Sequence, residues 1–202
     1  MKAFLNQDKL VYENPDFSQK DTTTNKTLGA NFQYTLFLNS GHNLVWGADW
    51  REDEVDSRMA DGASRIGGRR KVHRSGIYLQ DEIKTSADFT LVLGARYDSH
   101  SVYGSELSPR VSLLYHLGEL TSLRCSWGKA FRPPTVNDLY WYEDWGYGMG
   151  LFGNPNLTPE ISSEFEIGIE HIFTPDILGR VTFFSAQADS LINWVQTQPW
   201  RW

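Results

Sequence analysis

The sequence has a single cysteine, Cys125, among its 202 residues. One thiol excludes an internal disulfide framework and any zinc site built from several cysteines. The five histidines are scattered, and none lies near another at the spacing of metal ligands. The sequence therefore predicts neither a disulfide-stabilised domain nor a metal centre.

Positive charge is also in short supply, because 19 Lys and Arg stand against 25 Asp and Glu, a formal net charge of −6. Domains that bind nucleic acid carry a basic face, so no nucleic-acid partner is expected. Catalytic arrangements are equally scarce. Glu164 and Glu166 lie about 7 Å apart on one face of one strand, whereas glycosidase chemistry needs two carboxyl groups that face each other. We expect no enzymatic activity and no cofactor.

Long hydrophobic runs are missing as well. No stretch approaches the roughly 18–20 apolar residues of a transmembrane helix, and the mean hydropathy is −0.45. Residues 1–8 lack the continuous apolar core of a secretory signal. These totals are typical of a soluble, acidic protein, but the order of residues along the chain contradicts them.

Apolar and polar residues alternate with period 2 along most of the chain, which is the pattern of strands with two different faces. Between residues 28 and 38, the even positions carry Leu, Ala, Phe, Tyr, Leu and Leu, and polar residues take most of the odd ones. The pattern predicts about nine antiparallel strands, near residues 2–12, 25–38, 42–52, 72–84, 89–99, 107–117, 120–131, 161–173 and 178–189.

Short and long connections alternate between these strands. The short turns are 39–41, 85–88, 118–119 and 174–177, and the longer links are 13–24, 53–71, 100–106 and 132–160. All short turns then lie at one end of a meander, as in outer-membrane β-barrels with short periplasmic turns and long extracellular loops. A soluble β-sandwich alternates its faces equally well, but it has no reason to segregate loop lengths.

The polar positions of the strands carry charges where a small soluble barrel would place its packed core. Inward-facing charges fit a wide, water-filled lumen, with the apolar face turned to the lipid bilayer. The predicted fold class is therefore all-β, an antiparallel up-and-down transmembrane β-barrel. We expect its lumen-facing charges to be Arg51, Arg96, Arg110, Arg124, Glu164, Glu166 and Arg180.

Several motifs resemble the barrel of TonB-dependent outer-membrane receptors of the siderophore type. They include WGKAFRPPT at 127–135 with DLY at 138–140, and GNPNLTPE at 153–160, and the parts at 131–140 and 153–160 are the most specific. The resemblance extends in the right order over nearly the whole chain. Its other parts are GADWR at 47–51, YLQDE at 78–82, GARYD at 94–98, SPRVS at 108–112 and DSLI at 189–192.

The resemblance implies a bacterial outer-membrane barrel of about 22 strands, plugged by an N-terminal globular domain. Such receptors import scarce large nutrients, usually ferric siderophores and sometimes haem, cobalamin or sugars. Energy comes from the inner-membrane TonB–ExbB–ExbD complex, which pulls on a short box ahead of the plug.

Nine strands alone would leave two open edges in lipid, where each unpaired backbone group costs several kcal/mol. We therefore interpret residues 1–202 as a partial barrel, without the signal peptide, the TonB box, the plug and the remaining strands. Pro199 and the weak alternation of the last ten residues predict a truncation rather than a native barrel end at Trp202.

Two of the predicted loops carry candidate functional residues. Aromatic rings in 132–160 could stack on an aromatic or hydrophobic ligand, and a guanidinium at the loop base could meet anionic groups. The same rings could instead pack the loop against itself. The loop 53–71 runs from acidic to basic residues, and we expect a solvated loop whose arms partly neutralise each other; a charged lip that selects ligands is the alternative. The candidate ligand-binding residues are Arg132, Tyr140, Trp141, Tyr142, Trp145, Tyr147 and Phe152.

Together these features predict a fragment of an outer-membrane active-transport receptor that imports a ferric siderophore or a similar large nutrient with TonB-supplied energy. Two other functions stay open. One is a passive small outer-membrane barrel or porin, and the other is a soluble, lipocalin-like binding barrel.

Overall fold

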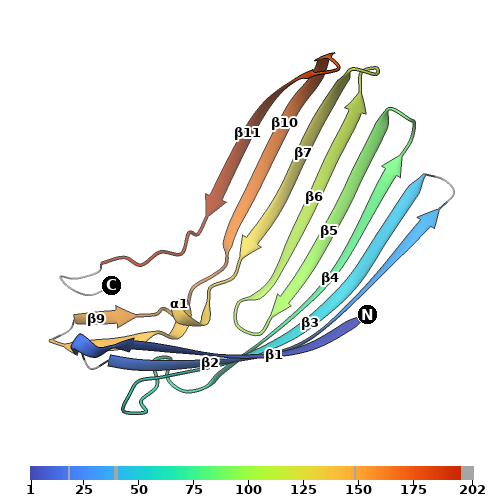
Figure 1. Cartoon of the computed structure of the whole chain (residues 1–202). Helices are drawn as coiled ribbons and strands as arrows, with labels where there is room; N and C mark the ends of the chain where they lie inside the picture. The colour runs from blue at the N-terminus through green and yellow to red at the C-terminus, as the bar shows by residue number, and fades with distance from the viewer. Residues whose placement is uncertain (18, 39–40, 148, 197–202) are drawn as a thin grey trace.

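Nine strands form one antiparallel sheet in the computed structural model of the chain, which describes residues 1–17, 19–38, 41–147 and 149–196 (Figure 1). Neighbours in the sheet follow one another in the sequence, except that β10 pairs with β7. The predicted up-and-down meander of about nine strands is therefore confirmed. Its strands are β1 (Lys2–Asn14), β2 (Gln19–Leu38), β3 (His42–Arg58), β4 (Arg70–Lys84), β5 (Phe89–His100), β6 (Gly104–His116), β7 (Thr121–Arg132), β10 (Glu160–Thr174) and β11 (Ile177–Asp189).

Four short elements lie outside this sheet. A 3-10 helix, η1 (Pro15–Phe17), follows β1. Between β7 and β10 the chain forms α1 (Val136–Tyr140) and a hairpin of β8 (Tyr142–Gly146) and β9 (Met149–Phe152). As far as the structure describes the chain, the large sheet is open, with β1 and β11 at its edges (Figure 1). None of the described helices is long and apolar enough to cross a membrane.

Strands β2 and β3 extend further than the alternation predicts. β2 begins at Gln19 rather than near residue 25, and β3 ends at Arg58 rather than near residue 52. Their pairing continues as far as Thr22 opposite Arg58. Both faces of this stretch are polar, so backbone pairing continues there without the apolar periodicity that identifies a strand in sequence.

The connections follow the predicted two-ended pattern only in part. Short turns join β4 to β5, β6 to β7 and β10 to β11 at one end of the sheet, and the predicted turn at 39–41 falls mostly outside the described residues (Figure 1). At the other end, the connections at 59–69 and 133–159 are long. The link between β5 and β6 is only 101–103, because their pairing runs on to His100 opposite Gly104. The predicted long link 13–24 is short as well, because β1 runs to Asn14 and β2 begins at Gln19. The expected contrast in loop length therefore fails at these two connections.

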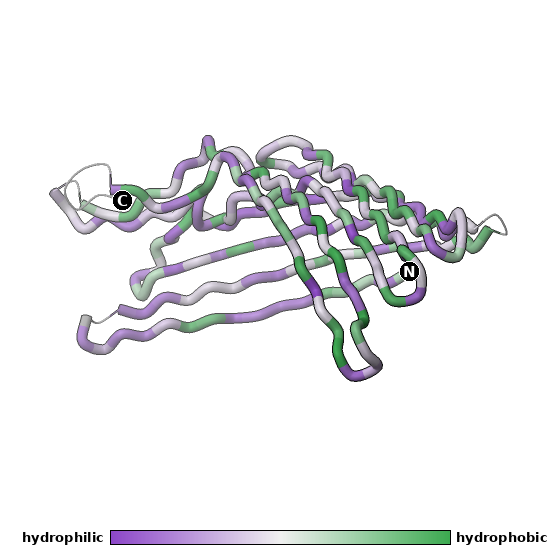
Figure 2. The backbone as a smooth tube through the Cα atoms, turned by 90° about the horizontal axis from the view of Figure 1, so that it is seen from above, coloured by the Kyte–Doolittle hydropathy of each residue, from purple (hydrophilic) through white to green (hydrophobic). Residues whose placement is uncertain are grey.

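The two faces of the sheet differ in polarity, and Figure 2 shows the hydropathy alternating along the strands. On the apolar face, which we call the outer face, Trp46 and Trp127 each remain 41% exposed. Among the described residues, the buried apolar side chains are Ile66 and Leu139, and both lie outside the large sheet. Other exposed apolar residues of the outer face are Leu28, Phe32, Trp50, Ile77, Leu79, Leu93, Leu107, Phe165, Ile167 and Ile169.

A soluble domain of this size buries many apolar side chains in a core. Here the apolar side chains instead cover one face of a sheet and stay accessible. A contiguous apolar surface of this extent is typical of a membrane or a protein contact. The fold therefore gives no support to the soluble, lipocalin-like alternative.

Candidate functional site

The longest connection, 133–159, begins with a capped helical turn. Thr135 is the N-cap of α1: its hydroxyl accepts a hydrogen bond from the backbone N–H of Asp138 at 3.1 Å. The Asp138 carboxylate in turn accepts from the backbone N–H of Thr135 at 2.8 Å. This reciprocal capping box satisfies two backbone donors and fixes the direction in which the chain leaves β7.

The β8–β9 hairpin follows directly and is held against α1. The backbone N–H of Gly153 donates to the carbonyl of Trp141 at 2.7 Å. A Cβ at Gly153 would lie 2.7 Å from the backbone nitrogen of Tyr140, so only glycine fits this close approach. Across the hairpin, the rings of Tyr142 and Phe152 meet edge to face with centroids 5.3 Å apart. The hairpin is thus a packed unit rather than a free loop.

The two aromatic side chains at the tip of the hairpin are exposed to solvent. Trp145 is 51% exposed and Tyr147 is fully exposed, and we call these two side chains the tip rings. Gly146 and Tyr147 both have left-handed backbone angles, with φ of 82° and 55°. A non-glycine residue in this region is disfavoured by roughly 1–2 kcal/mol. Tyr147 is therefore held at a strained backbone position with its ring in solvent.

The six aromatic residues of the predicted ligand-binding set thus separate into two groups. The tip rings face outward, together with the half-exposed edge of Tyr142. Tyr140, Trp141 and Phe152 are half-buried in contacts within the loop region. Packing of the loop against itself, which the sequence left open, accounts for the second group.

Arg65, in the connection 59–69, is the centre of these contacts. Its Nη2 lies 3.2 Å from the Asp21 carboxylate on β2, and its Nη1 lies 3.0 Å from the Glu143 carboxylate on β8. The guanidinium also lies 5.7 Å from the ring centroid of Trp141. Arg65 is only 5% exposed. The expectation of a solvated loop is wrong at this residue, because the loop docks on the hairpin and buries it.

Further contacts tie the connection 59–69 to α1 and β8. The backbone N–H of Tyr142 donates to the carbonyl of Arg65 at 2.7 Å. Arg70 donates through Nε to the carbonyl of Ile66 at 2.9 Å, and its guanidinium lies 4.1 Å from the ring centroid of Tyr140. The two buried apolar side chains, Ile66 and Leu139, come one from each of these segments. The sequence offers a weak signal of this docking, an isolated isoleucine in a polar loop.

Arg132, at the base of the loop, has its guanidinium occupied. It donates through Nε and Nη2 to the two carboxylate oxygens of Glu160, each at 2.6 Å. An anionic ligand group at Arg132 would have to compete with this bidentate pair. Binding of a ligand by Arg132 stays a prediction.

A smaller aromatic cluster lies at the end of the sheet that carries the long connections. The ring of Tyr103, between β5 and β6, stacks on His100 with centroids 4.1 Å apart and meets Phe131 edge to face at 6.0 Å. Burial in this cluster raises the pKa of the Tyr103 phenol to about 12. The phenol is therefore neutral throughout the physiological range.

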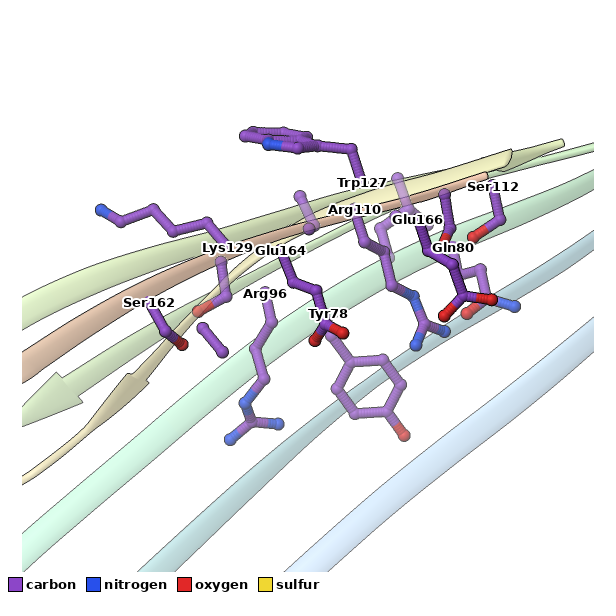
Figure 3. A pocket seen from close by; sticks show the side chains of 17 residues that line it. Tyr78, Gln80, Arg96, Arg110, Ser112, Trp127, Lys129, Ser162, Glu164 and Glu166 are labelled. Atoms are coloured by element: carbon purple, nitrogen blue, oxygen red, sulfur yellow. The ribbon is translucent and has the colours of Figure 1, made fainter. Parts of the chain in front are cut away.

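Register places the seven predicted lumen charges on one face of the sheet, which we call the inner face. A hollow of about 710 Å³ lies on this face (Figure 3). In Figure 3, Arg96, Arg110, Glu164 and Glu166 project from one side of the sheet, and Trp127 projects from the other.

Arg96 is the most highly coordinated of these charges. It donates to both oxygens of Asp49, at 2.7 and 3.1 Å, and to both oxygens of Asp98, at 2.6 to 3.0 Å. It also lies 5.8 Å from the ring centroid of Tyr78. A Cβ at Gly76 would overlap Nη2 of Arg96 and lie 2.8 Å from Asp98 Oδ1. Glycine at this position lets the guanidinium lie flat on the sheet.

Other inner-face arginines also have acidic partners. Arg51 donates to Asp53 at 2.7 Å. Arg180 donates to Glu170, whose carboxylate lies 3.7 Å from Arg124. Four of the seven predicted lumen charges are therefore paired with carboxylates of the same face.

The other three charges, all at the hollow, lack such a partner among the described residues. Across the described ranges, the structure gives no ion-pair partner to Arg110, Glu164 or Glu166. Arg110 instead lies over Gly94, where a Cβ would come 3.1 Å from its Nε. The hollow is therefore lined by free charge of both signs. As for metals, in the part of the chain that the structure describes, no group of three or more His, Cys, Asp or Glu is arranged to hold an ion.

Known proteins share both this sequence pattern and this fold. A vitamin B12 transporter, BtuB of Vibrio vulnificus, is 26% identical over 99% of this chain, which covers 32% of that transporter. An iron-regulated outer membrane virulence protein of Vibrio cholerae is 25% identical over 86% of the chain, which covers 28% of that protein. The chain thus spans about a third of the length of these relatives or less.

Among solved structures, a mutant of the ferric enterobactin receptor PfeA of Pseudomonas aeruginosa superposes with a TM-score of 0.75. The identity is 20%, over 91% of this chain and 31% of that receptor. The siderophore receptor PirA of the same organism gives a TM-score of 0.69 at 24% identity, over 83% of this chain and 32% of PirA. These likenesses show a shared barrel fold.

The family described as TonB dependent receptor-like, beta-barrel, matches residues 3–201, which is almost the entire chain. The nine-stranded meander, the polar inner face and the exposed apolar outer face are what that barrel requires. The chain belongs to the TonB-dependent receptor family and forms part of its β-barrel.

Proposed function

We propose that this chain is part of an outer-membrane receptor that binds a ferric siderophore or a similar large nutrient on its loop side and imports it with energy from the TonB–ExbB–ExbD complex. The outer face lies in the lipid bilayer, and the inner face lines a water-filled lumen. The relatives named as a vitamin B12 transporter and an iron-regulated outer membrane protein support a nutrient of this class.

The observation that carries the binding proposal is the pair of tip rings. Trp145 and Tyr147 project into solvent from a hairpin that is itself firmly packed, and Tyr147 holds a strained backbone angle to do so. Strain of this kind persists where the surrounding structure imposes it and is concentrated at ligand-binding sites. Exposed rings on a rigid support stack well on planar or hydrophobic ligand groups.

The inner face supplies the polar path in this proposal. The hollow of about 710 Å³ presents Arg110 together with Glu164 and Glu166. In the whole receptor these charges would meet either polar groups of the nutrient or the plug that the family resemblance implies. The compensated charges, Arg96 above all, would keep the wall of the lumen fixed.

Binding to the whole receptor in outer-membrane vesicles tests the proposal, with ferric enterobactin, haem and vitamin B12 as the probes. We expect one probe to bind, and the double substitution Trp145→Ala with Tyr147→Ala to weaken it by at least about tenfold, since each stacked ring contributes on the order of 1 kcal/mol.

A control is Tyr97→Ala, which removes a ring from the outer face whose exposure, 45%, is close to the 51% of Trp145. It should leave the affinity unchanged. Equal affinity in the tip variant and in the control would contradict ligand capture by the tip rings.

A further inference from the structure

We propose that Arg65 is the positioning residue of the aromatic hairpin: it locks β8–β9 to β2 and to the connection 59–69, so that the tip rings are held in one orientation before a ligand arrives. The consequence for affinity rests on the proposed function. The locking itself is a property of the loops and does not depend on which nutrient is bound.

Asp21, Arg65 and Glu143 lie far apart in the sequence, and each belongs to a different loop-side segment. One guanidinium joins all three, with distances of 3.2 Å to Asp21 and 3.0 Å to Glu143. A backbone hydrogen bond from Tyr142 to the Arg65 carbonyl joins β8 to the connection 59–69, and the guanidinium adds Asp21 of β2 to this contact. A planar guanidinium with several separate N–H donors is suited to spanning two carboxylates in this way.

The side chains of the three residues are largely buried, and that of Arg65 keeps only 7% of its exposure. Removing the cation would leave Asp21 and Glu143 as two like charges in a poorly hydrated site. Loss of one member of a buried ion-pair network is strongly unfavourable, because the remaining charges lose their compensation. The hairpin would therefore be driven away from β2.

Another arginine of the same connection serves as a comparison. Arg69 lies 3.4 Å from Glu54, but its side chain is 57% exposed. An ion pair whose cation is open to water in this way is screened and contributes little. Arg69 thus provides a matched control, a nearby arginine with carboxylate partners but without burial.

The functional consequence is preorganisation. A hairpin already fixed in its binding orientation loses less conformational freedom when a ligand binds, so the affinity is higher. Arg65 touches neither tip ring in the contacts given above. It acts on them through Glu143 and through the Trp141 ring, which lies beneath the guanidinium at 5.7 Å.

Amide hydrogen exchange in the whole receptor, without any ligand, tests this inference. In Arg65→Gln we expect the hairpin amides of residues 142–146 to exchange about tenfold faster or more. Arg69→Gln should leave them unchanged. Arg65→Lys keeps the charge but cannot span both carboxylates, so its exchange rates should fall between the two.

A second variant keeps the test decisive if Arg65→Gln does not insert into the membrane. Glu143→Gln cuts only the link to the hairpin and leaves the pair of Arg65 with Asp21 in place. It should speed exchange in the hairpin while the connection 59–69 stays protected. In addition, the hairpin amides should exchange more slowly in the double variant Arg65→Gln with Glu143→Gln than in Arg65→Gln alone. The double variant removes one of the two carboxylates, Asp21 and Glu143, that repel each other once the cation is lost.

Hairpin exchange that is the same in Arg65→Gln, Glu143→Gln and Arg69→Gln would overturn the inference. The proposed function would be unaffected by that result, since tip-ring substitutions would still weaken a bound probe. Conversely, the receptor could bind none of the probes and still show the expected exchange pattern. That result would support the positioning role of Arg65 and contradict the proposed function.

Discussion

Arg132 and Glu160 clamp the two ends of the longest loop together. They are the last residue of β7 and the first of β10, they oppose each other in the sheet register, and their side chains form a bidentate pair with both distances at 2.6 Å. The backbone N–H of Ile192 donates to the same carboxylate at 2.6 Å. Glu160 therefore holds three segments at the base of the candidate site.

Glu160→Gln should loosen this base. The amide keeps the shape of the side chain but lacks the charge that Arg132 and the Ile192 N–H both recognise. We expect faster hydrogen exchange at the Ile192 amide and a small loss of thermal stability. Glu106→Gln, which removes a carboxylate 3.6 Å from Lys129 on the same face, is the control and should leave Ile192 unchanged. Unaltered exchange at Ile192 in both variants would show that the clamp does not hold this segment.

Gly76→Ala should disrupt the inner-face network around Arg96. The added Cβ would overlap the guanidinium and force it away from Asp49 and Asp98. Overpacking of this kind costs on the order of 1–3 kcal/mol. Gly128→Ala is the control, because a Cβ there meets nothing closer than 3.6 Å. Urea unfolding in detergent should show a lower midpoint only for Gly76→Ala, and equal midpoints would contradict the close fit.

Two substitutions of Tyr147 distinguish the contribution of its ring from the contribution of its backbone angle. Tyr147→Gly removes the ring and relieves a left-handed angle that disfavours other residues by roughly 1–2 kcal/mol. Tyr147→Ala removes the same ring but keeps the strain. We expect both variants to lose probe affinity equally and only the glycine variant to gain hairpin protection in hydrogen exchange. Unequal affinities would assign the effect to the backbone instead.

Tyr103 gives the loop end of the sheet a dependence on alkaline pH. Its pKa is raised from 10.0 to about 12 by burial, so the folded phenol keeps a proton that the unfolded phenol loses. The resulting contribution of Tyr103 to the free energy of unfolding is fully present below pH 10 and is lost as the pH rises towards 12. Absorbance titration of the phenolate should show one late-titrating tyrosine that is missing in Tyr103→Phe. A normal titration near pH 10 at this residue would contradict its burial.

The sheet could be predicted from sequence because its strands meet two different surroundings. In β10, Phe165 and Ile167 alternate with Glu164 and Glu166, and such a period of 2 has one structural meaning. Where both sides of a strand are polar, as at the start of β2 near Gln19, the signal disappears although the backbone pairing continues.

The loop architecture could not be predicted in the same way. The Arg65 contacts with Asp21 and Glu143 depend on how three connections fold back on one another, and no local periodicity encodes that. Only local signals remain visible, such as Thr135 three residues before Asp138, which forms the capping box of α1. The aromatic composition of the loop made it a candidate region for ligand binding, but it did not separate the tip rings from the packed ones.

The account depends most on the outer face lying in lipid while the inner face meets water, and spin labelling along β6 tests this most directly. In a Cys125→Ser background, single cysteines introduced from residue 110 to residue 115 would carry a nitroxide in receptor reconstituted in lipid vesicles. Oxygen, which concentrates in lipid, should reach labels at Val111, Leu113 and Tyr115, whereas a water-soluble nickel complex should reach those at Arg110, Ser112 and Leu114. Accessibility that does not alternate, or that alternates in the opposite phase, would contradict a membrane barrel built on this sheet.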